Sequence, residues 1–287
     1  MKRVAPKLVA AGAAAVASAL FALPASAAFH GSNGLIAYTG PGGGPTCVLG
    51  DPTCGLAVWT AQPDGSHAQK ISPNSQKPSW SPFGSELAVQ YHDTGTNAQY
   101  TDLLRPGGEF EFGQFTPGPQ DLSPAFSGDA KHVFVMRDGG IARAARTGQA
   151  QLVQIIRAGN SPASSGSNQL AYERGGDIWT ANQNGGHVKR LTKTKAREGA
   201  PNWSPNSKQI VFARGAVNHR QIWVMNANGT HQKRLTHGAD DAGPAYSPDG
   251  KFIAFSRFGR LMVMNANGTG IHQIARQGLD PDWQPVR

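Results

Sequence analysis

The sequence has few acidic residues and none of the common catalytic motifs. Only 18 of the 287 residues are Asp or Glu, against 27 Lys or Arg. No Gly-x-Ser-x-Gly or His-Glu-x-x-His motif occurs, so the usual signatures of serine hydrolases and zinc proteases are missing. No pair of carboxylates is forced together, so a two-carboxylate glycosidase site cannot be picked out. We therefore name no catalytic residue and no cofactor, and favour a binding role over catalysis.

Long runs of Lys and Arg are missing too, although the formal net charge is +9. Without such a run or a nucleic-acid-binding motif, we expect no nucleic-acid partner. The positive charge instead favours attraction to anionic molecules. We expect an envelope protein or an acidic peptide as the partner, with an anionic glycan as the alternative, and a monomeric protein.

Cysteine is nearly absent, with Cys47 and Cys54 as the only two. They lie close together in a loop rich in Gly and Pro. A metal site built on two cysteines would need further His or carboxylate ligands, and only Asp51 is nearby. An even pair of cysteines outside the cytoplasm is typical of a disulfide. We predict a Cys47–Cys54 disulfide and no metal site.

Only one long apolar run occurs, at the N-terminus. The basic residues Lys2, Arg3 and Lys7 precede an alanine-rich run over residues 8–23, and Ala25-Ser26-Ala27 follows it. This order is typical of a secretory signal peptide, so we predict one over residues 1–27, cleaved before Ala28. The alternative is an uncleaved anchor, but the run is short and weakly apolar for that role. We expect an exported protein, periplasmic or secreted, with no transmembrane segment after cleavage.

Glycine and proline, in contrast, are abundant at 36 and 20 residues, and they recur in a repeat. Pro201-Asn202-Trp203-Ser204-Pro205 returns as Pro244-Ala245-Tyr246-Ser247-Pro248, each time followed by a short apolar run. Related anchors lie at Trp80, Phe126, Ser164 (degenerate) and Trp283. A period of roughly 40 residues built from short strands and glycine turns is typical of the blades of a β-propeller.

The two ends of the chain are incomplete in complementary ways. The first repeat has three strands but no anchor, and the last anchor, at Trp283, has no strands after it. We therefore predict an all-β fold, a ring of six four-stranded antiparallel blades over residues 28–287, with the C-terminal strand completing the first blade. The predicted blades are 34–72 plus 279–287, 77–116, 121–156, 158–192, 199–236 and 242–275.

The run Pro-x-Trp-Ser-Pro, followed by Ile-Trp-Val-Met-Asn-Ala-Asn-Gly-Thr and Arg-Leu-Thr, resembles the WD40-like (PD40) repeat of the TolB-type six-bladed propeller family. The likeness covers the chain from Gly34 onward and is strongest after Gly175. It implies the fold far more than a function. TolB itself also carries an N-terminal α/β domain that finds no room among the repeats here, which argues against a role in the Tol–Pal system.

Strand order in such a ring places the ends of the second strands on one face, which we call the top face. Arginines occupy this position in four repeats, and together with Tyr91 and a neighbouring loop they form the candidate binding site. Its members are Tyr91, Arg137, Arg174, Arg214, Arg257, Lys193, Lys195 and Arg197.

Arginine matches carboxylates with a planar fork, so this face could dock an acidic peptide or an anionic ligand. In the alternative interpretation each arginine pairs with a carboxylate of the next blade and has only a structural role. The hypothesis is thus an exported, non-catalytic protein- or ligand-binding module. The alternative is a propeller hydrolase or lyase with a metal in the central channel.

Overall fold

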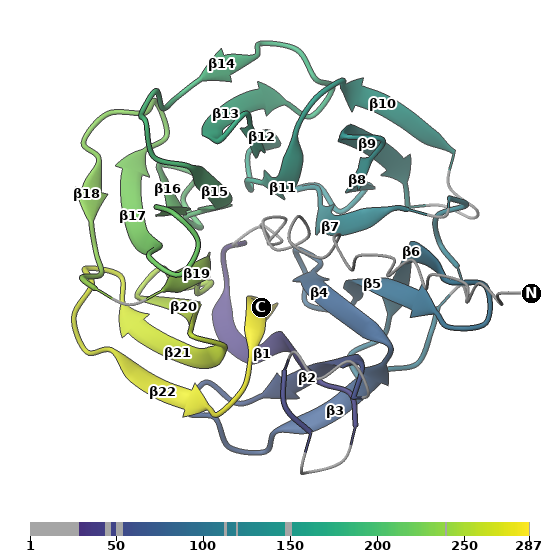
Figure 1. The fold of residues 1–287 in the computed structure, drawn as a ribbon. Helices are drawn as coiled ribbons and strands as arrows, with labels where there is room; N and C mark the ends of the chain where they lie inside the picture. Colours follow the sequence, from purple (N-terminus) through teal and green to yellow (C-terminus); the bar gives the residue numbers. More distant parts are fainter. Residues whose placement is uncertain are drawn as a thin grey trace, which may run out of the picture.

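The protein is a closed ring of six antiparallel β-sheets around a central opening (Figure 1). The computed structural model describes residues 29–43, 47–49, 54–111, 114–118, 120–146, 151–238 and 240–286. The predicted signal peptide lies outside these residues. Among the described residues no helix has the length and apolar character needed to cross a bilayer.

The strands follow one pattern, from the centre of the ring outward. Blade 1 contains β23 (Leu279–Val286), β1 (Ser32–Pro41), β2 (Leu56–Ala61) and β3 (Gln69–Pro73); blade 2 contains β4 (Ser75–Trp80), β5 (Leu87–Asp93) and β6 (Ala98–Leu104); blade 3 contains β7 (Leu122–Phe126), β8 (His132–Arg137), β9 (Gly140–Ala145) and β10 (Leu152–Ile156). Blade 4 contains β11 (Asn160–Ser164), β12 (Gln169–Arg174), β13 (Asp177–Asn182) and β14 (Lys189–Arg190); blade 5 contains β15 (Glu198–Trp203), β16 (Gln209–Arg214), β17 (Gln221–Asn226) and β18 (Lys233–Arg234); blade 6 contains β19 (Asp241–Tyr246), β20 (Phe252–Arg257), β21 (Arg260–Asn265) and β22 (His272–Ala275).

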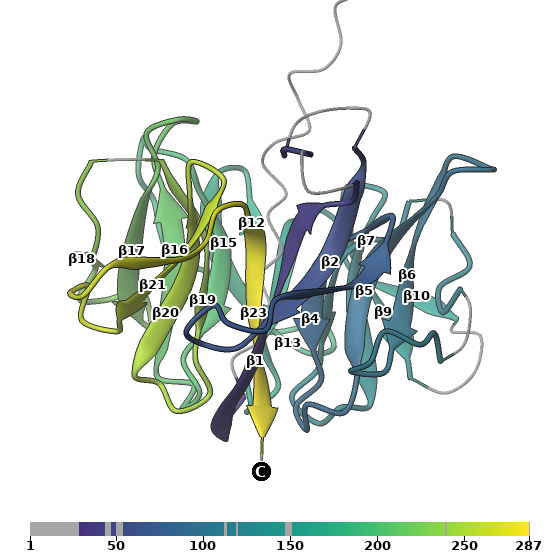
Figure 2. The ribbon, with the colours of Figure 1, turned by 90° about the horizontal axis from the view of Figure 1, so that it is seen from below.

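The predicted all-β fold and the closure of the ring are confirmed. Strand β23 is the innermost strand of blade 1 and pairs with β1, with Trp283 opposite Ile36 and Asp282 opposite Ala37. Figure 2 shows β23 and β1 side by side at the junction between the two ends of the chain. Closing the ring with the last strand leaves no exposed sheet edge between the first and last blades.

Blade 2 is the irregular member of the ring, because its described sheet has three strands. In place of a fourth regular strand, the segment after β6 returns along its edge. Backbone hydrogen bonds from Glu111 to Leu103 and from Thr116 to Thr101 cover that edge, and Leu104 forms an isolated bridge with Phe110. The outer edge of this blade is therefore not open for pairing along that stretch.

The hydrophobic core is divided among the blade interfaces rather than gathered in one place. The aromatic anchors predicted from the repeat are buried, with Trp80 at 0% and Trp203 and Trp283 each at 2% exposure. Trp283 packs in one cluster with Ile36 of blade 1 and Ala254 of blade 6. Burying an aromatic side chain of this size contributes about 2–3 kcal/mol, so each anchor holds two neighbouring sheets together.

Candidate functional site

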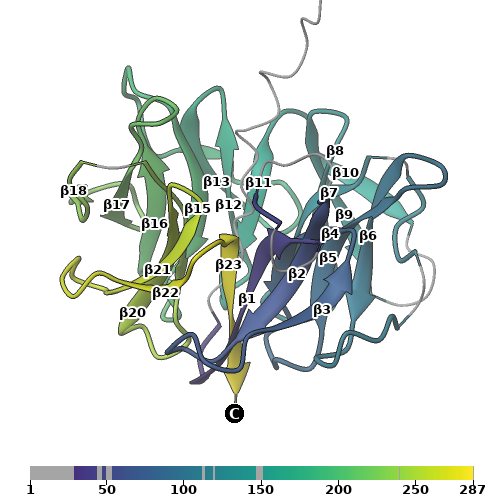
Figure 3. The same cartoon turned by 60° about the horizontal axis from the view of Figure 1, so that its bottom comes forward.

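The top face is the face at which the inner strands begin, toward the top of Figure 2, where β23 starts. The connections between second and third strands and the connections between blades both lie on this face, because neighbouring strands in every blade are antiparallel. All of the predicted binding residues belong to these connections or to the strand ends beside them. Figure 3 shows the same loops with the ring tilted.

Three of the four predicted arginines are held by ion pairs within their own blades. Arg214 Nε lies 2.7 Å from Glu198 Oε1, and Arg257 Nε lies 2.7 Å from Asp241 Oδ1. Arg137 Nε lies 3.0 Å from an oxygen of Asp121. The alternative interpretation placed each partner on the next blade, but all three carboxylates stand at the start of the inner strand of the same blade.

These pairs are well shielded from water. The side chains of the three carboxylates are 0% exposed, whereas the guanidinium side chains are 12–25% exposed. Arg214 also packs over the ring of Trp223, at 4.2 Å from the ring centre. Removing a carboxylate's partner inside a protein leaves an uncompensated charge at high cost. These arginines therefore stabilise the blades whatever else they bind.

Arg174 and the loop between blades 4 and 5 are different. Arg174 is exposed and stacks over Trp179 at 5.0 Å from the ring centre. Lys193 and Lys195 are exposed and have no ion-pair partner among the described residues. Arg197 is 57% exposed and lies 3.9 Å from Glu173. These four cations form what we call the basic patch, which comprises the end of β12 and the connection from blade 4 to blade 5 on the top face.

Glu173 is the titratable group inside the basic patch. It is buried, 3% exposed, and its Oε2 has no hydrogen-bond partner among the described atoms. Desolvation raises the pKa of Glu173 to about 7, and the nearby charge of Arg197 opposes this rise. A carboxyl group with this pKa is only partly ionised near neutral pH, so it offsets only part of the positive charge of the patch.

Tyr91 lies apart from the basic patch, on blade 2. Its ring packs against Tyr100 at 5.3 Å and, edge-on, against Phe110 at 5.5 Å between ring centres. Phe110 is 45% exposed. The residue is thus part of an aromatic cluster on the irregular blade and does not join the arginines.

The cysteine loop is fixed to the opposite side of the top face. Cys47 and Cys54 form the predicted disulfide. The Gln277 side chain accepts a hydrogen bond from the backbone of Leu49 and donates one to the carbonyl oxygen of Cys47 at 2.9 Å. Val48, in this loop, is 54% exposed, and Phe258, on the adjacent hairpin of blade 6, is 65% exposed. The loop therefore presents an apolar surface from a fixed base.

Among the described residues no group of three or more His, Cys, Asp or Glu side chains is arranged to hold a metal ion. Several carboxylates on the top face are instead paired with arginines, as Asp240 is with Arg220 at 2.5 Å. The described side chains of this face offer charged groups and apolar contacts to a ligand. Sequence reasoning missed Asp121 and Glu198, although both lie five residues before the anchor of their blade, as Asp241 does.

The ring of six sheets and its closure by the last strand define a six-bladed β-propeller. Residues 154–285 match the model of the TolB beta propeller domain, PD40, so this part of the chain is similar to that family. The resemblance inferred from the sequence is thereby confirmed.

Solved structures support the fold. TolB from Acinetobacter baumannii superposes with a TM-score of 0.70 at 20% identity, covering 88% of this chain and 67% of that one. A putative TolB from Agrobacterium tumefaciens gives 0.62 at 17% identity, covering 88% and 92%. A chain of a nidogen/laminin complex gives 0.66 at 12% identity, covering 88% and 100%. A search of curated proteins gives no match.

Proposed function

We propose that this protein is an exported, non-catalytic binding module of the cell envelope whose top face docks an acidic segment of another protein. The observation that carries the proposal is the basic patch. Lys193 and Lys195 are exposed, unmatched by any described carboxylate, and lie beside Arg174 and Arg197 on one pair of blades. Cations grouped in this way attract and orient an anionic partner.

The apolar surface of the cysteine loop adds a second kind of contact. Val48 and Phe258 are exposed on the same face, across the ring from the basic patch, and exposed apolar side chains on a functional face are typical of protein interfaces. An anionic glycan would use the basic patch but gain little from these side chains. A protein partner therefore accounts for more of the face than a glycan does.

Export is part of the proposal and rests on two observations. The Cys47–Cys54 disulfide is the kind of bond that persists outside the reducing cytoplasm. The predicted signal peptide over residues 1–27 agrees with that location. The A. baumannii and A. tumefaciens structures are TolB and a putative TolB, and at this level of identity they support the fold only.

The test compares two double variants with the same change of charge. Lys193→Glu with Lys195→Glu alters the basic patch, whereas Lys131→Glu with Lys208→Glu alters two exposed lysines in the turns of the opposite face. Binding of a fluorescent hexaglutamate peptide is measured by anisotropy at low and physiological salt. We expect the first variant to lose about tenfold or more in affinity and the second to lose little.

Equal losses in the two variants would mean that net charge alone attracts the peptide, and would overturn the assignment of the face. Undiminished binding of the peptide to the first variant would also overturn the assignment of the face. Capture experiments from an envelope fraction, run with the native protein and both variants, then identify the natural partner by its dependence on Lys193 and Lys195.

A further inference from the structure

The six inner strands share a backbone irregularity at one level of the central channel. In each, the residue before the conserved proline position of the repeat has a positive φ, between +50° and +57°, and the pairing register shifts at that point. The six residues are Asp280, Lys77, Ser123, Ser161, Ala200 and Gly243, in the order of blades 1 to 6. We call them the channel ring.

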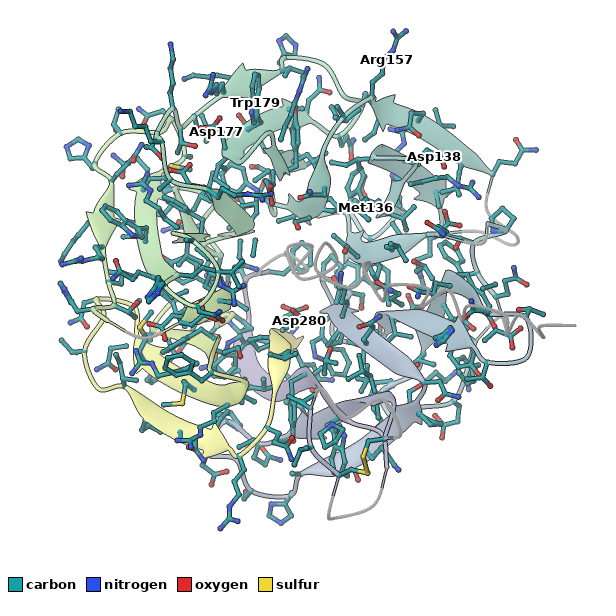
Figure 4. All side chains as sticks on the ribbon, in the orientation of Figure 1. Met136, Asp138, Arg157, Asp177, Trp179 and Asp280 are labelled. Atoms are coloured by element: carbon teal, nitrogen blue, oxygen red, sulfur yellow. A yellow bond between two sulfur atoms is a disulfide. The ribbon has the colours of Figure 1, made fainter. Side chains whose placement is uncertain are left out.

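Positive φ is uncommon for residues other than glycine, so five of these six positions adopt a conformation that side chains resist. Six repetitions of the same β-bulge show that the bulge belongs to the fold itself. A bulge re-aims the side chain of the extra residue. Figure 4 labels Asp280 and shows its side chain directed into the central opening.

Members of the channel ring differ sharply in chemistry from one side to the other. Blades 1 and 2 supply a carboxylate and an ammonium group, and blades 3 and 4 supply hydroxyl groups. Blades 5 and 6 supply only Ala200 and Gly243. A Cβ placed on Gly243 would come no closer than 3.7 Å to Asp280, so the small side of the ring leaves space next to the carboxylate.

The two opposite charges of the ring do not bond to each other. Lys77 Nζ donates to Ser123 Oγ at 3.1 Å. Asp280 Oδ2 accepts only a long hydrogen bond of 3.4 Å from Thr39. No ion pair joins Lys77 and Asp280 within the described residues, although each charge influences the pKa of the other.

Two oxygens of the channel ring are buried without a partner. Asp280 is 4% exposed, and its Oδ1 has no hydrogen-bond partner among the described atoms. Ser161 is 0% exposed, and its Oγ has none either. Burying such groups unpaired costs free energy. A ligand that supplied a donor to the carboxylate would remove that cost.

We propose that the channel ring is a binding site for a small zwitterion of the amino-acid class. The carboxylate of the ligand pairs with Lys77 Nζ and Ser123 Oγ, and its ammonium group pairs with Asp280 Oδ1. A ligand with one charge would satisfy one member of the pair and leave the other uncompensated. A metal cation is disfavoured for the same reason, because the ammonium group of Lys77 repels it.

This site is separate from the basic patch and does not depend on the proposed docking of a protein. It uses inner-strand residues at the centre of the ring, whereas the patch lies on the connection between blades 4 and 5. Ala200 and Gly243 offer no polar side chain to a ligand. The site therefore selects a ligand by the arrangement of its charges more than by the shape of its side chain. The smallest zwitterion, glycine, is therefore the appropriate probe.

The experiment measures glycine binding by calorimetry at pH 7.5, with acetate and methylammonium as single-charge comparisons. We expect glycine to bind at least tenfold more tightly than either. Asp280→Asn and Lys77→Met should each weaken glycine binding at least tenfold. Asn and Asp both tolerate positive φ, so the first variant keeps the backbone conformation of the bulge. Lys251→Met, an exposed lysine of the opposite face, serves as the control and should bind as the native protein does.

Thermal unfolding of each variant establishes that the propeller is still folded. If Lys77→Met does not fold, Lys77→Arg with Ser123→Ala tests the same carboxylate position and should weaken glycine binding without removing the charge. Absence of glycine binding to the native protein would overturn the proposal. So would acetate binding as tightly as glycine, or unchanged glycine affinity in both ring variants.

Discussion

The Asp282 carboxylate accepts a hydrogen bond of 2.6 Å from the backbone N–H of Trp80, which lies 202 residues earlier in the chain. Its other oxygen accepts from the N–H of Trp283 at 2.9 Å. Asp282 belongs to blade 1 and Trp80 to blade 2, so this carboxylate joins the last strand of the chain to the second blade. In the same way, the Asn202 side chain of blade 5 accepts a hydrogen bond from the backbone N–H of Tyr246 in blade 6.

Replacing Asp282 should weaken the closed ring. Asp282→Ala leaves the buried N–H of Trp80 without its acceptor, and we expect a loss of about 1–3 kcal/mol in the free energy of unfolding. Urea denaturation measures it. Asp64→Ala, at an exposed turn where the carboxylate accepts from Ser66, is the control and should cost less than half as much. Equal costs would show that the bond to Trp80 contributes nothing special.

The ion pair of Glu198 and Arg214 allows a double-variant test. Arg214→Met removes the partner of a carboxylate with 0% side-chain exposure, and we expect a loss of about 3–5 kcal/mol. Adding Glu198→Gln to the same protein removes the stranded charge and should restore more than half of that loss. Denaturant titration of both variants decides the matter. A double variant as unstable as the single one would contradict the explanation.

Stability should depend on pH through Glu173. The pKa of this carboxyl is raised in the folded protein to about 7, above its ordinary value, so the folded state holds the proton more tightly than the unfolded state does. Stability must then fall as pH rises from about 4.5 to about 7, by up to about 3 kcal/mol.

Glu173→Gln removes this titration. We expect the variant to be more stable than the native protein at pH 8, with a flatter stability profile across that pH range. Thermal melts at closely spaced pH values provide the measurement. Glu109→Gln, on an exposed turn, is the comparison and should leave the profile as it was. A profile that Glu173→Gln does not flatten would count against the raised pKa.

The disulfide should matter more for the top face than for the ring. Replacing Cys47 and Cys54 with Ser frees a short loop, and we expect a stability loss of about 2 kcal/mol with no loss of the fold. The hydrogen bonds of Gln277 to this loop should no longer fix Val48. Hydrogen exchange of the amide of Leu49 measures this directly, and protection equal to the native level would show that Gln277 alone fixes the loop.

The ring can be predicted from the sequence because each repeat carries its own short, local motif. Proline and an aromatic anchor recur with each blade, and the unfinished first repeat together with the unattached Trp283 predicts closure. Blade 2 departs from the pattern after Leu104, where Pro and Gly replace the apolar alternation of an outer strand. Its irregular edge is set by backbone bonds to β6 that no repeat specifies.

The candidate site could be predicted only in outline. Position in the repeat predicts arginines at the top ends of the second strands, and they are found there. Their partners Asp121, Glu198 and Asp241 each lie five residues before the anchor of their blade, but the other three repeats have no acidic residue at that position. The channel ring was missed for a related reason. The position before proline changes its residue in almost every blade, so only its shared backbone conformation reveals it.

The pairing of β23 with β1 also orders events during synthesis. Blade 1 needs Ser32–Pro41 and Leu279–Val286 in one sheet, so the first blade begun is the last one finished, and the toroid cannot lock before residue 286 has left the ribosome. Until then the nascent chain is an open arc in which the inner edge of β1 has no partner. The closed form is therefore reached in one late step, when β23 pairs with β1.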